Sequence, residues 1–263
     1  MVVMNYGIIN NANGTLTANS LGGFLGGFMS FDPTGQFAYV ASNLLSTVSA
    51  YRVDSSTGTF TAIATYSSGI SPASIVVDHS GKFVYVATPG LQNGITAYSI
   101  DPGTGALVSL GAFALGSTPS SVSLDPAGHY AYSTGAGITV FGINSTTGAL
   151  TPAGAISAGS IFHSIAFEST GKFAYAANSR FDTVDAYAVN VTTGALTAIG
   201  TIAAGVTPLN LAIDPGNKFI YVTNNQSNNI SAFSINATTG VLTSIGTFAA
   251  GNGPQVISIV NAP

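Results

Sequence analysis

The sequence predicts an all-β fold, a six-bladed β-propeller whose blades are four-stranded antiparallel sheets. Three observations support this prediction. A strand phrase, seen as FIYVTNN at residues 219–225, recurs at 37–43, 83–89, 130–136 and 173–179. A turn phrase, seen as ATTGVLT at 237–243, recurs in five further copies. No stretch of useful length has the 3.6-residue periodicity of an amphipathic helix.

The glycine of the turn phrase marks the length of the repeat. It stands at six positions separated by 44, 47, 43, 46 and 46 residues: Gly14, Gly58, Gly105, Gly148, Gly194 and Gly240. A period of roughly 45 residues that holds four short strands is typical of a propeller blade, because one such sheet cannot bury both faces without neighbours. We therefore expect a single propeller domain over residues 1–263.

Within each repeat, four strands rich in Val, Ile, Phe, Tyr and Thr alternate with turn residues. In the second complete repeat we expect strands at 74–78, 83–87, 95–101 and 106–113. The first two strands are joined by turns such as Asp32–Gly35, Asp-Pro-Thr-Gly, in which Asp, Pro and Gly each suit their backbone position. The tyrosines of the strand phrase, from Tyr39 to Tyr221, are expected to pack between blades.

The two ends of the chain depart from the repeat. Five complete repeats run from Gly23 to Phe248. They are preceded by a third and a fourth strand at 2–10 and 15–18, and followed by one first strand at 254–260. Joining these pieces would make a sixth blade closed by both termini. Because no stretch supplies its second strand, we expect either a three-stranded sixth blade or a chain trimmed at its start.

Composition narrows the classes of function. Charged residues make up 5% of the chain, where about 25% is usual, so Ser, Thr, Asn and Gly must supply the surface polarity, which favours an extracellular or periplasmic protein. Five Lys and Arg against nine Asp and Glu give no basic field for nucleic acid. No apolar run reaches the roughly 18 residues of a membrane span. The absence of cysteine excludes disulfides.

The phrases YVASN at 39–43 and YVTN at 221–224, with the D-x-x-G and T-G-x-L-T turns, resemble the YVTN-repeat propellers. Within them the chain is most similar to the lactonase branch, which includes 6-phosphogluconolactonase-like and muconate cycloisomerase-like proteins. The resemblance covers almost the whole chain and implies ring-opening of a lactone, although relatives also include surface-layer repeat proteins. The lactonase pattern is usually seven-bladed and carries more charge in its pocket. A phosphate would need about two or three convergent cations, so we expect an unphosphorylated substrate.

The fourth repeat carries the candidate site. Fourth-to-first and second-to-third connections share one face of a propeller, and on that face this repeat has Phe162–Ser164 where others begin with proline. It also carries Arg180 and Asp182, then Asp185 where other repeats have a hydroxyl. We predict that His163 is a general base, that Arg180 stabilises an oxyanion and that Asp182 orients the histidine. The predicted substrate-binding residues are Asn43, Phe162, Asn178, Asp185 and Asn224.

Two functions follow from these residues. The first is a lactonase-like hydrolase acting on a small lactone or ester; the second is a non-catalytic extracellular propeller that binds a sugar, peptide or protein, which the sparse charge favours. In the second case Arg180 would form only a surface ion pair with Asp182 or Asp185. The histidines lack metal-ligand spacing and no dinucleotide or phosphate loop occurs, so no metal or cofactor is expected. The stretch Gly22–Phe28 is the next candidate for the site.

Overall fold

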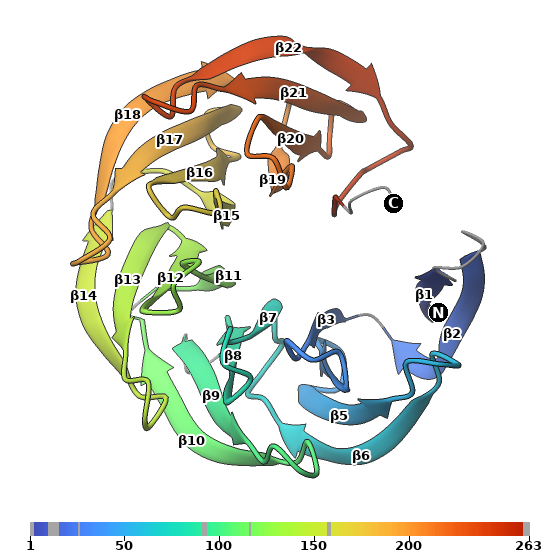
Figure 1. Cartoon of the computed structure of the whole chain (residues 1–263). Coiled ribbons are helices and arrows are strands. Elements are labelled where there is room, and N and C mark those ends of the chain that lie inside the picture. The colour runs from blue at the N-terminus through green and yellow to red at the C-terminus, as the bar shows by residue number, and fades with distance from the viewer. Residues whose placement is uncertain are drawn as a thin grey trace. The chain divides into compact units, whose positions relative to one another are not determined.

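The computed structural model describes residues 3–9, 16–25, 27–90, 94–115, 117–156 and 159–259. These residues form five four-stranded sheets and one two-stranded sheet, each with its strands in chain order (Figure 1). The predicted six blades are wrong, because the described residues form five sheets with the four strands of a blade. Within these ranges there is no helix, as predicted, and therefore none long and apolar enough to cross a membrane.

The chain divides into two compact units. The first contains residues 1–119 with 146–149. It holds a two-stranded sheet of β1 (Val3–Ile9) and β2 (Leu16–Leu25). One four-stranded sheet contains β3 (Phe28–Phe31), β4 (Phe37–Ser42), β5 (Thr47–Val53) and β6 (Phe60–Ser67). The next contains β7 (Ser74–Val77), β8 (Phe83–Thr88), β9 (Gly94–Ile100) and β10 (Leu107–Ala114). These last four strands confirm the predicted ones to within a few residues.

The second unit contains residues 120–145 and 150–262. Its first sheet contains β11 (Pro119–Leu124), β12 (Tyr130–Gly135), β13 (Gly137–Ile143) and β14 (Leu150–Ile156). Its second contains β15 (Phe162–Phe167), β16 (Phe173–Asn178), β17 (Thr183–Val189) and β18 (Leu196–Ala203). Its third contains β19 (Pro208–Ile213), β20 (Phe219–Asn224), β21 (Asn229–Ile235) and β22 (Leu242–Ala249).

A tyrosine in the second strand of a sheet fastens that sheet to the turn phrase of the next. Four such tyrosines are fully buried, and each donates its hydroxyl hydrogen to the carbonyl of a turn glycine. The pairs are Tyr39–Gly105 (3.1 Å), Tyr85–Gly148 (3.0 Å), Tyr132–Gly194 (2.8 Å) and Tyr175–Gly240 (2.9 Å). Burial raises the pKa of each hydroxyl above its ordinary value. The predicted packing of these tyrosines between sheets is confirmed.

The turn glycines are required both by the backbone conformation of the turn and by this contact between sheets. Gly105 and Gly240 have φ of 74° and 70°, in the left-handed region that disfavours other residues. A Cβ atom at Gly105 would also lie 2.2 Å from Cδ1 of Phe37, and one at Gly240 would lie 2.3 Å from Cδ1 of Phe173. The Thr-Gly phrase is therefore the mark of an inter-sheet contact, which explains why it recurs so faithfully.

Acidic side chains organise the turns, as predicted. In the turn between first and second strands, Asp78 Oδ1 accepts hydrogen bonds from the backbone N of Lys82 and Phe83, both at 2.7 Å. In the turn between third and fourth strands, Asp54 Oδ1 accepts from the hydroxyl and N of Ser56 at 2.6 and 2.8 Å. Those bonds lower the pKa of Asp54 to about 2. These carboxylates are turn formers rather than groups available for chemistry.

The predicted blade closed by both termini does not form in the described residues. β1 pairs with β2, with Ile9 opposite Leu16, and β2 reaches Leu25, so it includes most of the glycine-rich stretch 22–28. Residues 254–259 form no strand, although a first strand was predicted at 254–260. A strand needs a partner for its backbone groups, and the described part of the chain provides none here.

Residues 254–259 nevertheless pack beside β19. The N–H of Ile257 donates to Asn210 Oδ1 at 3.1 Å. The same kind of bond joins β7 to β3, where the N–H of Val77 donates to Ser30 Oγ at 3.0 Å. The C-terminal segment therefore contacts the preceding first strand as a first strand would, without pairing as one.

Candidate functional site

Most of the predicted site residues lie in or beside the turn between the second and third strands of a sheet. The strand registers align one position of the third strand in all five sheets, opposite the residue that follows the tyrosine of the second strand. This position is occupied by Ser49, Thr96, Thr139, Asp185 and Ser231. Only the sheet β15–β18 replaces the hydroxyl with a carboxylate. The strand register thus places Asp185 at the position that the sequence repeats predicted, equivalent to the hydroxyl residues of the other sheets.

Asp185 belongs to a hydrogen-bonded cluster at the end of β16. Nδ2 of Asn178, which is 1% exposed, donates to Asp185 Oδ2 at 3.0 Å and to Ser160 Oγ at 3.2 Å. Thr183 Oγ1 donates to Asp185 Oδ1 at 2.9 Å, and the backbone N of Arg180 donates to Asn178 Oδ1 at 3.3 Å. Each carboxylate oxygen holds one donor and keeps a further lone pair for a ligand.

Asn224 occupies the matching position in the sheet β19–β22. Its Nδ2 donates to Asn229 Oδ1 at 2.8 Å and to Ser231 Oγ at 2.9 Å. The side chain is 0% exposed, and its Oδ1 has no hydrogen-bond partner among the described residues. A Cβ atom at Gly205 would lie 2.7 Å from Asn224 Cγ, so backbone covers the amide. Asn224 therefore supports the turn from beneath, out of reach of a ligand at the surface.

His163 is the extra residue of a β-bulge at the start of β15. Phe162 and Ser164 pair with Asn178 and Ala177, which are consecutive, so His163 has no cross-strand partner of its own. The imidazole is half-buried, and burial lowers its pKa. No other residue in the described part of the chain forms a hydrogen bond with this ring. Burial favours the uncharged ring, and an uncharged imidazole keeps a nitrogen lone pair that can take up a proton.

Arg180 projects from the turn between β16 and β17 and is exposed. Its guanidinium carbon lies 5.7 Å from the ring centroid of the adjacent Phe181. The surface ion pair considered from the sequence is not formed, since among the described residues neither Asp182 nor Asp185 makes a salt bridge with it. The guanidinium is therefore available to an anionic group.

Asp182 has a structural contact that its sequence context did not reveal. Its backbone φ is 56°, and its Oδ1 accepts a hydrogen bond from the N of Thr207 at 2.8 Å. Ser46 and Asn228 have the same left-handed φ, 56° and 55°. They accept equivalent bonds from Ser71 at 3.3 Å and Gly253 at 2.7 Å. Asp182 therefore follows the template: it stands four residues after Asn178, as Ser46 does after Ser42, and fastens the turn to the connection that follows the fourth strand.

Two other predicted residues form no hydrogen bond of this cluster through their side chains. Phe162 is 1% exposed and packs in a core with Tyr132, Ile138 and Ile165, so its contacts are those of a packing residue. Asn43 is exposed in the turn after β4, in the first unit. The structure thus brings together Asn178, Asp185 and the backbone of Arg180, with His163 one residue beyond the partner of Asn178.

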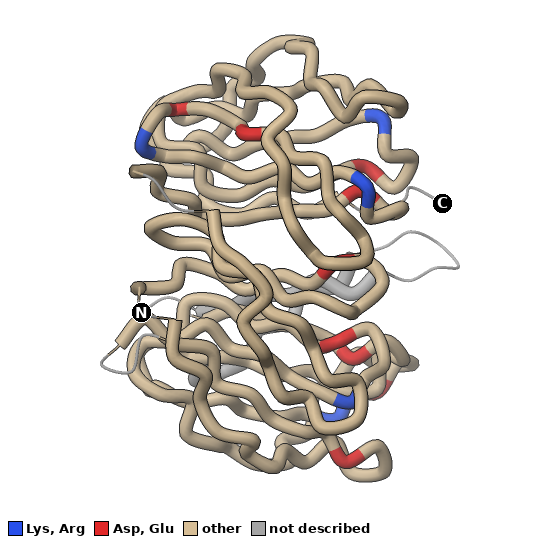
Figure 2. The backbone as a smooth tube through the Cα atoms, turned by 90° about the vertical axis from the view of Figure 1, so that its left-hand side faces the viewer, with Lys and Arg blue, Asp and Glu red and all other residues tan. Residues whose placement is uncertain are grey.

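Charges are few and dispersed (Figure 2). Lys172 precedes β16 and Arg180 follows it, so the two cations lie at opposite ends of one strand. Among the described residues, no group of three His, Asp or Glu side chains could hold a metal ion. The ionisable residues that the sheet β15–β18 carries at this end are His163, Arg180, Asp182 and Asp185.

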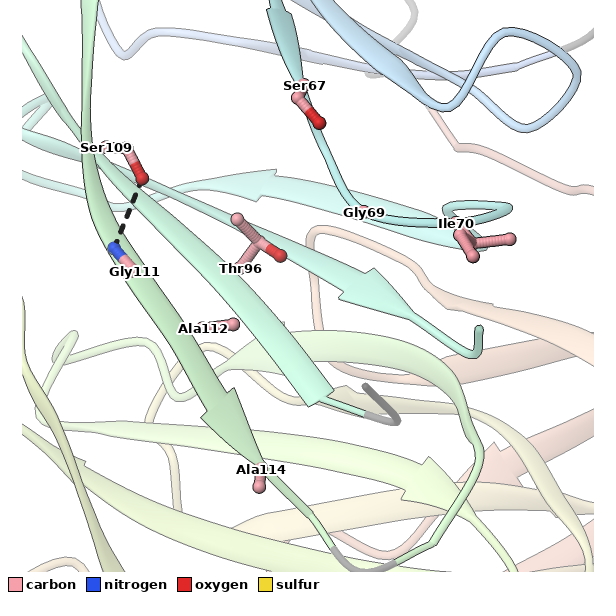
Figure 3. A pocket seen from close by; sticks show the side chains of 8 residues that line it. All are labelled: Ser67, Gly69, Ile70, Thr96, Ser109, Gly111, Ala112 and Ala114. Atoms are coloured by element: carbon pink, nitrogen blue, oxygen red, sulfur yellow. Dashed lines mark hydrogen bonds between the residues drawn. The ribbon is translucent and has the colours of Figure 1, made fainter. Parts of the chain in front are cut away.

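A pocket of about 820 Å³ lies in the first unit (Figure 3). It was not predicted, because its residues follow the repeat template and none is ionisable. The connection after β6 contributes one wall and strands β9 and β10 contribute the other. The lining residues are Ser67, Gly69, Ile70, Thr96, Ser109, Gly111, Ala112 and Ala114. Its size is within the roughly 300–1,000 Å³ range of small-molecule sites.

Comparison with protein families settles the relationship. The model of the family described as "Lactonase, 7-bladed beta-propeller" matches residues 28–163 and 162–259, which is most of the chain. The chain belongs to this lactonase family. The family's seven blades also contradict the predicted six. The YVTN-repeat resemblance remains a prediction. No curated protein matches the sequence significantly.

Several solved structures share this fold at low sequence identity. A putative 6-phosphogluconolactonase from Bacteroides fragilis aligns with a TM-score of 0.80 at 20% identity, covering 95% of this chain and 78% of that one. The periplasmic gluconolactonase PpgL of Pseudomonas aeruginosa aligns with a TM-score of 0.61 at 14% identity, covering 97% and 94%. Hydrazine synthase of Kuenenia stuttgartiensis aligns with a TM-score of 0.72 at 15% identity, covering 95% and 82%. At these identities the alignments support the fold alone.

Proposed function

We propose that the chain is a lactonase-like hydrolase that opens a small, unphosphorylated lactone or ester beside His163. Membership of the lactonase family supports the reaction class. The observation that carries the site is the His163 imidazole: it is half-buried, its pKa is lowered by burial, and no described residue occupies its nitrogens. A general base must be unprotonated and must have a nitrogen lone pair that no other group occupies.

The reaction needs two proton transfers, one from water to His163 and one from His163 to the departing oxygen. His163 takes a proton from water as the water oxygen forms a bond to the carbonyl carbon. Arg180 stabilises the oxyanion of the tetrahedral intermediate. The C–O bond of the lactone ring then breaks, and the protonated imidazole returns its proton to the departing oxygen. Asp182 acts as a positioning residue, since it fastens the turn that carries Arg180 to Thr207, and the cluster of Asn178 and Asp185 binds substrate hydroxyls.

The distribution of cations supports an unphosphorylated substrate. All five Lys and Arg lie in the described residues, and three of them directly precede the second strand of a sheet: Lys82, Lys172 and Lys218. Arg180 follows its second strand, at the other end of the sheet, so within the second unit a phosphate at this end would meet one cation. Tight phosphate binding uses several charge-assisted hydrogen bonds.

The test is a panel of neutral lactones and esters and their phosphorylated counterparts, assayed with and without calcium. We expect turnover of a neutral lactone, a loss of about 100-fold in kcat for His163→Ala, and an acid limb of the rate profile below the ordinary histidine pKa. His129→Ala is the matched control, because His129 lies in the turn before β12 at the opposite end of its sheet. Full activity of His163→Ala would overturn the assignment of the base.

A second candidate function, binding without catalysis, is supported by a different observation. Asp182 is engaged with Thr207 and Arg180 is exposed without an ion pair among the described residues, an arrangement that also suits an extracellular or periplasmic module that binds a carbohydrate or protein through Arg180. In that case the panel gives no turnover, while Arg180→Ala weakens binding of the ligand.

A further inference from the structure

We propose that the pocket between β6 and β10 is a binding site for a small uncharged polyhydroxylated molecule, such as a monosaccharide. It lies in the first unit, whereas His163 lies in the second, and the proposal does not depend on hydrolysis at His163. About 820 Å³ is ample for a molecule of this size.

The lining excludes charged ligands. None of the lining residues has an ionisable side chain. A carboxylate or phosphate that entered would lose part of its hydration without gaining an ion pair or a charge-assisted hydrogen bond. Thr96 occupies the position that carries Asp185 in β17 and a hydroxyl in the other three sheets, so the pocket is neutral at this position. The pocket has a hydroxyl where the other sheet has a charge.

The hydrogen bonds within the pocket leave one donor and one acceptor for a ligand. Thr96 Oγ1 donates to the carbonyl of Ser68 at 2.9 Å, so its hydrogen is used and its lone pairs remain. Ser109 Oγ accepts from the N–H of Gly111 at 3.2 Å, so its hydrogen remains. Both side chains belong to the pocket wall in Figure 3. A ligand hydroxyl both donates and accepts, and can therefore engage this pair.

The remaining lining supplies room and apolar contact. Gly111 follows Leu110, the unpaired residue of the β-bulge in β10; its φ is 98°, and no atom lies within 4 Å of the place where its Cβ would be. Ile70 is 49% exposed on the facing wall, and Ala112 presents a methyl group. Sugar rings have C–H faces that pack against such groups, while their hydroxyls reach the polar pair.

The experiment measures binding of glucose, gluconate and glucose 6-phosphate to the full chain by saturation-transfer difference NMR and calorimetry. We expect millimolar binding of glucose and binding of the two anions that is weaker by at least about tenfold, the equivalent of one lost hydrogen bond or more. Ala112→Trp should abolish glucose binding by filling the pocket. Ser109→Ala should weaken it by about tenfold or less.

Matched variants separate this site from the proposed catalytic one. Thr247 pairs with Ser231 as Ala112 pairs with Thr96, so Thr247→Trp introduces the same side chain at the equivalent exposed place in another sheet and should leave binding unchanged. His163→Ala should also retain it. Unchanged glucose binding in Ala112→Trp, equal binding of the anions, or no binding of glucose by the wild type would overturn the proposal whatever the outcome of the hydrolysis assay.

Discussion

The sheets β15–β18 and β19–β22 follow one template in different surroundings. Tyr175 is fully buried and bonded to Gly240, whereas Tyr221 is partly exposed and forms no hydroxyl hydrogen bond within the described residues. Phe173 packs against Gly240, whereas Phe219 is 36% exposed. The phenylalanine and tyrosine of the strand phrase are thus better covered in one sheet than in the other, although Ile220 and Val222 are fully buried. At these two positions a neighbouring sheet that presents a turn glycine supplies additional burial.

The largest difference is expected at the glycine that joins the two sheets. Gly240→Ala places a Cβ 2.3 Å from the ring of Phe173 at a φ of 70°. Left-handed strain and overpacking together should lower the free energy of unfolding by about 3 kcal/mol. The measurement is chemical denaturation of the full chain.

Gly200→Ala is the control for that substitution. Gly200 lies in β18 with no atom within 4 Å of its missing Cβ and a φ outside the left-handed region, so its replacement should change stability by under about 0.5 kcal/mol. Equal destabilisation by the two variants would show that close approach at the turn glycine does not join the sheets.

A second difference lies in the first turn of each sheet. Glu168 is 4% exposed and accepts hydrogen bonds from Thr170, Lys172 and Phe173, whereas Asp214, in the matching turn, is more exposed. We expect Glu168→Gln to cost about 2 kcal/mol at pH 7, as for hydrogen bonds to a charged group. Asp214→Asn should cost less.

The pH dependence of that cost follows from the pKa of Glu168. Burial raises this pKa, but the hydrogen bonds lower it further, and the net value lies below the ordinary 4.5. The stabilisation is therefore complete above the unfolded pKa and is lost as pH falls through the folded pKa. The stabilities of the wild type and of Glu168→Gln should converge as pH falls below 4.5 and through the folded pKa. A constant difference between the two proteins across this range would exclude the carboxylate as the cause.

The contrast between the sheets also shows which features could be predicted from the sequence. The strand phrase and the Thr-Gly phrase predicted the strands, the turns and the buried tyrosines, because each phrase reports a local requirement. Counting glycines failed for the number of blades, since a Thr-Gly turn marks only the hairpin of third and fourth strands. Residues 254–259 have the pattern of a first strand, but strand formation depends on a partner that local sequence does not report.

The candidate site also contains one feature that the local sequence revealed and one that depends on a distant partner. Asp185 departs from the template visibly, and the register confirms its position. The contact between Asp182 and Thr207 spans 25 residues and depends on a left-handed backbone, so Asp182 resembled a free acid in the sequence. Its equivalence to Ser46 and Asn228 was readable from spacing, yet their different side chains concealed the shared bond.

A smaller difference is expected from the tyrosine hydroxyls. Tyr175→Phe removes a buried hydrogen bond and leaves the carbonyl of Gly240 without its donor, which should cost about 1 kcal/mol. Tyr221→Phe should have almost no effect, because that hydroxyl has no partner among the described residues. Thermal unfolding of both variants measures the difference. A loss in Tyr221→Phe as large as in Tyr175→Phe would mean that Tyr221 is covered in solution.

The smallest change in stability is expected where the two sheets differ most in chemistry. Asp185→Ser gives the sheet β15–β18 the hydroxyl that Ser231 supplies in β19–β22. Ser231 accepts the hydrogen bond of Asn224 at 2.9 Å, so the introduced hydroxyl should accept that of Asn178, and the free energy of unfolding should change by under about 1 kcal/mol. If the carboxylate binds substrate hydroxyls, the variant raises KM severalfold and leaves kcat nearly unchanged, because binding is lost equally in the ground and transition states. Ser231→Asp, the reciprocal change, should leave KM unaltered. A stability loss in Asp185→Ser as large as that of Gly240→Ala, with KM unchanged, would make Asp185 a structural residue and remove it from the proposed site.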